Sequence, residues 1–356
     1  MLERIREQQE AKRLLAAALR EGPSHAYLLH GPSGVGKRRA AVAFAGELLG
    51  DPERVERLSH PDLYVLEPLG DQIRIDDIRL LHHDLHMRPF EADRRVYLIA
   101  SAHLLNEDAA DALLKDLEEP PPYAVLLLLA DELGPLPETI RSRCQLVPFT
   151  RLSERAVREE IAARAPTVSD EEATALARIA GGRLDRLERL LDPKGAERRA
   201  NALWVARGIY ADPELDASAA ADALLEGIGV AGQEAKAAAE AELERLELPE
   251  REAEQRVRRA QRGAEREELL LALEELAAWY RDLVVVAAGA DRAVVHYDRL
   301  DELREDASPE RSQAAEQAAE LVRETWRAFE ELNLQASLAL EALFVRLRRA
   351  LVAVPA

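Results

Sequence analysis

The chain has 356 residues, of which 47% are apolar, 32% charged and only 4% aromatic. This composition is typical of a folded, helix-rich protein of two or three domains, and it excludes an intrinsically disordered chain. The formal net charge of -19 repels nucleic acid, so any DNA contact has to be confined to a local basic patch.

The single cysteine, Cys144, excludes both an intrachain disulfide and a zinc site made of thiolates. The first residues, MLERIREQQEAKRLL, alternate charges and contain no apolar core of signal-peptide length. The sequence also has no apolar run of about 18 residues that would span a membrane. We therefore expect a cytoplasmic protein without membrane contacts.

Residues 1–150 alternate short apolar runs with helical patterns. Strands alternating with helices indicate an α/β domain whose parallel sheet is covered on both faces. The expected strands are residues 26–30, 63–66, 96–100 and 125–130, and the clearest helices are residues 37–49 and 107–117.

The expected strands stop near residue 151. Residues 151–197 read as a small set of short helices, and residues 198–356 read as almost entirely helical, with leucines at a 3.6-residue period from Leu269. The charge-dense stretch of residues 234–268 is interrupted by Pro249. It is typical of a solvated helical hairpin, with a partner-docking surface as the alternative.

A glycine loop follows the first expected strand and leads into a helix, which is the context of a phosphate-binding P-loop. Backbone N–H groups at the start of that helix favour a phosphate, and Lys37 would reach the outer phosphates. A working P-loop has Ser or Thr after this lysine to hold magnesium, whereas this chain has Arg38. The candidate nucleotide-binding positions are Gly31, Pro32, Ser33, Gly34, Val35, Gly36, Lys37 and Arg38.

The second magnesium contact of an ATPase is an acidic residue at the end of another strand. At the corresponding end of VYLIASAHLL this chain has Ala100 and Ser101, and neither supplies a carboxylate. His103, nearby, is interpreted as structural. The sequence thus predicts a degenerate P-loop without ATP hydrolysis, and it leaves open whether the loop binds ATP or ADP weakly.

Two further groups of residues are candidate sites. In RSRC, residues 141–144, the arginines are either ordinary surface residues or, at Arg143, an arginine finger that reaches a neighbour's nucleotide. His82, His83 and His86 form the one close histidine cluster. We interpret them as surface or partner-facing residues, and we expect no metal site and no bound zinc.

Several segments together resemble the AAA+ clamp-loader subunits of bacterial DNA polymerase III, and among these the non-catalytic delta-prime family. The resemblance covers nearly the whole chain, and its most specific block is ALLKDLEEPP, residues 112–121. Ala100 and Ser101 replace the Asp-Glu pair of the ATPase relatives. The other segments that carry it are SHAYLLHGPSGVGKR, HPDLYVLEP, TIRSRC, WYRDLVVVAAGA and LNLQASLALEALFVRL.

The resemblance implies an AAA+ α/β domain at residues 1–150, a helical lid at 151–197 and a helical collar domain for oligomerisation at 198–356. It implies assembly with delta and gamma/tau subunits, action on the sliding clamp and primer–template DNA through the complex, and a role for Arg143 as the finger that serves a neighbouring ATPase subunit.

This chain departs from the family at three places. The four-cysteine zinc module of many relatives is absent between residues 50 and 59, Leu184 stands at the register of the lid arginine, and Ala130-Asp131 lacks the usual threonine. Two other functions were considered, an active gamma/tau-type motor ATPase and a free-standing P-loop nucleotide kinase. The first needs the missing carboxylates, and the second explains neither RSRC nor the helical C-terminal part.

Overall fold

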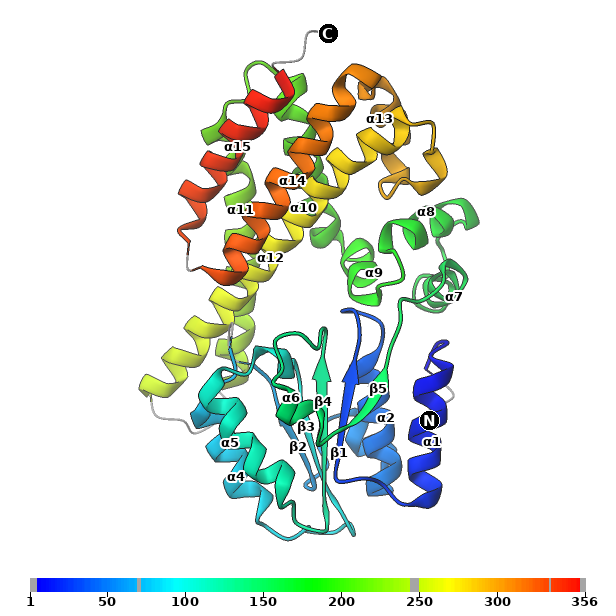
Figure 1. Ribbon diagram of the computed structural model, residues 1–356, viewed down its shortest axis with the longest axis vertical. Coiled ribbons are helices and arrows are strands. Elements are labelled where there is room, and N and C mark those ends of the chain that lie inside the picture. The colour runs from blue at the N-terminus through cyan, green and yellow to red at the C-terminus, as the bar shows by residue number, and fades with distance from the viewer. Residues whose placement is uncertain (1–4, 69–71, 244–249, 333, 353–356) are drawn as a thin grey trace. The chain divides into compact units, whose positions relative to one another are not determined.

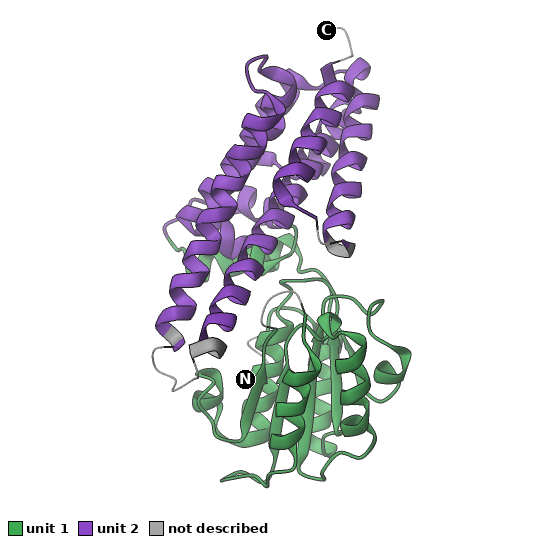
Figure 2. Ribbon diagram, turned by 90° about the vertical axis from the view of Figure 1, so that its left-hand side faces the viewer, with its two compact units in different colours: residues 1–166, 181–186 green, residues 167–180, 187–356 purple. Residues whose placement is uncertain are grey.

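The computed structural model describes residues 5–68, 72–243, 250–332 and 334–352. The chain divides into two compact units (Figure 2). The first consists of residues 1–166 and 181–186, and the second of residues 167–180 and 187–356.

The first unit is built on a five-stranded parallel sheet with the order β2-β3-β4-β1-β5 (Figure 1). This arrangement confirms the α/β class expected from the sequence. Four strands lie where the apolar runs predicted them. A fifth, β5, follows the last expected strand, residues 125–130, and was not predicted. The strands are β1 (Ala26–His30), β2 (Leu63–Leu66), β3 (Arg95–Ile99), β4 (Ala124–Ala130) and β5 (Gln145–Pro148).

Helices cover both faces of this sheet, and the two-residue period of the strands decides which side chain meets which layer. Tyr27 and Leu29 of β1 pack into one apolar cluster with α1 (Gln9–Glu21) and α2 (Lys37–Leu49). Leu28 packs into the opposite cluster with α4 (Ile75–Leu85) and α5 (Glu107–Glu118). Both faces of the sheet are therefore shielded from water, which explains why the strand sequences are continuous apolar runs.

Several helices begin at a residue whose side chain caps the first turn. Asn106 caps α5 by accepting a hydrogen bond from the Ala109 N–H, and Ser153 caps α7 (Glu154–Arg164) in the same way. Asp192 caps α10 (Pro193–Ala211), whose first residue is a proline, the residue that fits this position best. The first unit also contains the short elements α3 (Pro52–Glu56), η2 (Ala102–Leu104) and α6 (Glu138–Arg141).

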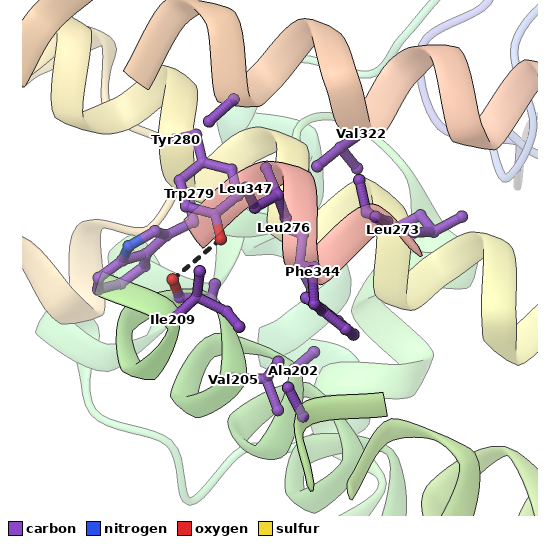
Figure 3. Close-up of a cluster of buried hydrophobic side chains, with 14 of the residues drawn as sticks. Ala202, Val205, Ile209, Leu273, Leu276, Trp279, Tyr280, Val322, Phe344 and Leu347 are labelled. Carbon is purple, nitrogen blue, oxygen red and sulfur yellow. Dashed lines mark hydrogen bonds between the residues drawn. The ribbon is translucent and has the colours of Figure 1, made fainter. Parts of the chain in front are cut away.

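The second unit is helical. Its apolar core gathers side chains from α10, α12, α14 and α15 around the buried pair Trp279 and Tyr280 (Figure 3). The Tyr280 hydroxyl donates to the Ala206 carbonyl at 3.0 Å. The further helices are α8 (Asp170–Ala180), α9 (Leu184–Leu191), which crosses the boundary between the units in sequence, α11 (Ala217–Leu243), α12 (Glu250–Ala287), η3 (Asp291–Ala293), η4 (Tyr297–Arg299), α13 (Leu300–Asp306), α14 (Pro309–Glu331) and α15 (Ala336–Val352).

A buried polar cluster lies within this helical unit. The fully buried ring of His296 sits between two carboxylates, with Nδ1 2.9 Å from Asp282 Oδ2 and Nε2 2.9 Å from Glu275 Oε2. Arg199, also buried, contacts Glu275 at 3.3 Å and Asp298 at 2.9 Å. Each buried charge thus has a partner of opposite sign, which is the condition under which buried charges are tolerated.

The division into domains at residues 150 and 197 stays a prediction, and α10 runs across the second of these positions. Pro249, the expected break in the charged stretch, lies outside the described residues. Within the described part of the chain, no helix combines the length and the apolar character needed to cross a bilayer.

Candidate functional site

The glycine loop lies between the end of β1 and the start of α2, at the carboxyl edge of the parallel sheet, where α/β proteins bind their ligands. Gly31, Gly34 and Gly36 all have positive φ angles, which glycine adopts without strain. At Gly31 an added Cβ atom would lie 2.1 Å from the Phe149 carbonyl oxygen. The loop therefore passes too close to β5 for any side chain at this position.

Lys37, the lysine that would meet the outer phosphates, is engaged within the chain. Its Nζ donates to the carbonyl oxygens of Gly31 and Pro32 at 2.6 Å each, and it forms an ion pair with Asp131 Oδ1 at 2.7 Å. An ammonium group has three donors, and all three have partners here. With a side chain only 7% exposed, Lys37 offers no donor to a phosphate in this conformation.

A carboxylate also lies against the loop. Asp185 Oδ2 accepts a hydrogen bond from the Ser33 hydroxyl at 2.9 Å, and a Cβ atom added to Gly34 would lie 1.8 Å from Asp185 Oδ1. The backbone N–H of Leu184 donates to the Gly34 carbonyl at 2.6 Å and fixes this contact. A phosphate entering at Gly34 would meet a carboxylate where a phosphate-binding loop offers donors.

Asp185 is held in its charged form. Burial opposes the charge, but hydrogen bonds and the ion pair from Arg183 outweigh it, together with bonds from Ser33 and the Arg186 N–H, and they keep the pKa of Asp185 below its usual value. The negative charge next to the loop is therefore present at neutral pH. This residue was not singled out from the sequence, although GGRLDR, residues 181–186, contains it directly after the position expected for the lid arginine.

The two positions that would hold magnesium carry other groups. Arg38 extends from α2 and forms an ion pair with Glu67, which follows β2. Ala100 is buried directly after β3, and Ser101 stands in the left-handed region with φ 54° as the residue before η2. Positions 100 and 101 therefore offer no carboxylate to a divalent cation, and position 38 carries a guanidinium in place of a hydroxyl.

His103 joins the ends of two strands. Its Nδ1 accepts a hydrogen bond from the Asp131 N–H at 3.3 Å. Burial lowers the pKa of His103, so the ring is neutral and available as an acceptor at neutral pH. These contacts agree with the structural interpretation of this residue, since the ring fixes the residue that also holds Lys37.

Arg143 lies just after α6 and makes its polar contacts with that helix and with α5. Its Nη1 donates to the Thr139 carbonyl at 2.9 Å, and its Nη2 pairs with Glu118. The side chain is 34% exposed and Glu118 is 51% exposed, so solvent reaches the pair. An exposed ion pair of this kind is worth only about 0 to 1 kcal/mol, and the guanidinium can exchange Glu118 for another anion at little cost.

The neighbours of Arg143 have different environments. Cys144 is buried in the sheet core, and burial raises the pKa of its thiol to about 12, so it is a packed, unreactive residue. Arg141 closes α6 and is partly buried.

The chain shares sequence similarity with several known proteins. Residues 7–153 match the family model described as "DNA polymerase III, delta subunit". The chain is 32% identical over 192 residues to DNA polymerase III subunit delta' of Bacillus subtilis and 34% identical over 195 residues to that of Pseudomonas aeruginosa. Residues 7–153 therefore resemble DNA polymerase III subunits, and the relatives of the chain include delta-prime subunits.

The matches to these delta-prime relatives have a limited extent. Each covers 51% of this chain, and the chain spans 58% of the Bacillus relative and 60% of the Pseudomonas relative. A solved structure, the DNA polymerase III gamma subunit-related protein of Thermotoga maritima, aligns over 96% of this chain and 99% of its own with a TM-score of 0.50 and 16% identity. That likeness concerns the fold, and it extends over both units.

Proposed function

We propose that this chain is a non-catalytic, delta-prime-type subunit of a clamp loader that serves DNA polymerase III during replication. The proposal is supported by the similarity to delta-prime relatives. The observation that carries it is that the ammonium group of Lys37 is bound by other groups of the same chain. A motor subunit needs this lysine for the nucleotide, whereas here carbonyl oxygens and Asp131 occupy it. The chain would act as a rigid part of the assembly.

The loop is proposed to be empty of nucleotide or to bind ATP or ADP only weakly, with no cofactor required. Three features support this proposal: the engaged lysine, the Asp185 carboxylate against Gly34, and Arg38 at the position of the magnesium ligand. An incubation of the purified chain with ATP and Mg²⁺ tests it. We expect no phosphate release above background, and turnover near 1 per second, the lower end of enzyme rates, would favour a motor ATPase instead.

Arg143 is proposed to serve as an arginine finger in the active site of a neighbouring ATPase subunit. A guanidinium supplied by a partner stabilises the charge that develops on the transferring phosphoryl group, and its planar fork suits two phosphate oxygens. The exposed pair with Glu118 supports this role, because a weak local partner keeps the side chain ordered while leaving it exchangeable.

The proposed partners are delta and gamma/tau subunits, with the sliding clamp and primer–template DNA reached through the assembled complex, in the cytoplasm. The net charge of -19 supports contact with DNA through the complex, because this chain alone repels it. Co-expression with delta and gamma/tau subunits tests the assembly. We expect one stable complex on gel filtration that loads clamps onto primed DNA, and failure to co-purify with either partner would overturn the proposal.

A further inference from the structure

Two histidines and a buried aspartate meet at the ends of two neighbouring helices of the α/β unit. His82 lies in the last turn of α4 and His86 caps it, a spacing that puts both rings on one face of the helix. Their ring centroids are 4.7 Å apart. Asp116 comes from the last turn of α5, and the candidate ligand atoms of the three side chains all lie within 4.8 Å of one another.

The aspartate of this triad is only partly satisfied. Asp116 is 3% exposed, and its Oδ1 lies 2.6 Å from His82 Nδ1. Its Oδ2 is buried and has no hydrogen-bond partner among the described residues. A buried carboxylate oxygen without a hydrogen-bond partner is unfavourable, because the water it loses on burial is not replaced by another donor. A cation bound beside it would remove that cost.

The surroundings favour a positive ion and allow it to enter. All three residues lie at the carboxyl ends of α4 and α5, where the helix dipoles place partial negative charge. The side chain of His82 is 51% exposed and His86 is also exposed, so an ion can reach the triad from solvent without opening the core.

This position is separate from the glycine loop. The Tyr97 hydroxyl of β3 donates to the Asp84 carbonyl at 3.1 Å, and Arg95, the first residue of β3, pairs with the Asp84 carboxylate at 2.7 Å. The end of α4 therefore lies by the amino end of the strands, whereas the glycine loop follows the carboxyl end of β1. The two sites can be changed independently.

The donor set identifies the kind of ion. Imidazole nitrogens with one carboxylate are ligands of zinc and similar transition-metal ions, whereas magnesium and calcium prefer oxygen ligands only. With bonds of about 2.0 to 2.2 Å, ligand atoms around a tetrahedral zinc lie about 3.3 Å apart. The contact between His82 and Asp116 would open by less than about 1 Å, which rotation of the exposed imidazole allows.

We propose that His82, His86 and Asp116 bind one divalent transition-metal ion, of which zinc is the best fit, and that its fourth coordination position faces solvent. The ion would tie α4 to α5. The expectation of no zinc rested on the single cysteine, on the missing four-cysteine module and on the interpretation of these histidines as surface residues. Nothing in the sequence indicated that α5 brings a buried carboxylate to them. The proposal does not depend on the clamp-loader function.

Zinc titration of the full-length chain, stripped with a chelator beforehand, tests this site by calorimetry. We expect one zinc per chain, and with Co²⁺ as probe we expect visible absorption typical of a four-coordinate ion. His82→Ala, His86→Ala and Asp116→Asn should each weaken zinc binding by more than about tenfold, because even changes outside the ligand shell cost about 10- to 100-fold. His83→Ala is the matched control, an exposed histidine of the same helix that lies outside the triad.

Asp116→Asn keeps the size of the side chain, and circular dichroism of each variant shows whether the chain is still folded. Loss of zinc binding in the three folded ligand variants, with His83→Ala unchanged, would support the site. Absence of zinc binding by the wild-type chain, or equal binding by wild type and all ligand variants, would overturn it and leave the pair of His82 and Asp116 as a helix-to-helix hydrogen bond.

Discussion

The Ser33 hydroxyl donates a hydrogen bond to the Asp185 carboxylate at 2.9 Å, although the two residues stand far apart in the sequence. This contact joins the glycine loop to the segment of residues 181–186 within one compact unit. An anion supplied by the chain itself thus lies against the glycine loop. Because Lys37 is already paired with Asp131, the charges around the loop oppose a phosphate.

Removing the charge of Asp185 should make the loop more receptive to nucleotide. We expect Asp185→Asn to bind a fluorescent ATP analogue at least about tenfold more tightly than the wild type, which is 1.4 kcal/mol. Hydrolysis should stay at background, because Ala100 and Ser101 still offer no carboxylate to magnesium. Asp76→Asn, at an aspartate whose side chain is 83% exposed on α4, is the control. Equal affinity of Asp185→Asn and wild type would show that this charge does not close the loop.

Lys37 should matter for stability and not for chemistry. We expect Lys37→Ala to lower the free energy of unfolding by about 1 to 3 kcal/mol, because the carbonyl oxygens of Gly31 and Pro32 lose their donor. Clamp loading by the assembled complex should stay at the wild-type rate. Chemical denaturation and a loading assay measure the two effects, with Lys194→Ala, whose side chain is 66% exposed, as control. A clamp-loading defect in a stably folded Lys37→Ala variant would contradict this prediction, because it would mean that a nucleotide bound at the loop contributes to loading.

Arg143 should act only in the complex. A finger contributes about 10³ to 10⁵ to the rate at its own site, but only one interface of the ring would use this arginine. We therefore expect Arg143→Ala to reduce the total DNA-stimulated ATPase in part and to reduce clamp loading further, without loss of assembly. Arg143→Lys should recover little, because an ammonium group lacks the planar fork.

The control for this prediction is Arg155→Ala, at an arginine whose side chain is 88% exposed on α7. Clamp loading at the wild-type rate by an assembled Arg143→Ala complex would contradict the finger role. Failure of that variant to assemble would identify Arg143 as a structural residue.

The buried His296 should make the helical unit less stable as pH rises. Burial by itself opposes the imidazolium, but hydrogen bonds to Asp282 and Glu275 outweigh it and raise the pKa of His296 above its ordinary value of about 6.5. The ionised ring therefore contributes stability that is complete below about pH 6.5 and is lost as pH rises through the folded-state pKa. Other charged groups at this cluster include Arg199, which pairs with Glu275 and Asp298, and Arg281, which contacts Asp282.

Thermal unfolding measured across pH 6 to 9 checks this expectation. The unfolding temperature of the wild type should fall over this range, and His296→Gln should be less stable at the acidic end and show a smaller dependence on pH. His83→Gln, at an exposed histidine, should retain the wild-type profile. A His296→Gln profile parallel to that of the wild type would contradict the role given to the imidazolium.

Features that depend only on residues close together in the chain could be predicted from the sequence. The four strands were recognisable because a strand buried on both faces is a continuous apolar run. The glycine loop was recognisable because its glycines and Lys37 lie within a few positions of one another. The absence of magnesium ligands at Arg38, Ala100 and Ser101 was equally predictable, because it follows from the identity of these residues alone. The strand β5 was not predicted, because QLVP is short and ends in proline. It is identified as a strand only by its pairing with β1.

The contacts between residues far apart in the chain could not be predicted without the folded structure. Asp131 reaches Lys37, Asp185 reaches Ser33, and Asp116 reaches His82, and each contact joins residues from different crossovers or loops of the chain. A local pattern states the face or the end of an element on which a side chain lies, but not the loop or helix that will lie opposite. That choice is made by the order of strands in the sheet and by the packing of helices on its faces, which bring together charges that the sequence separates.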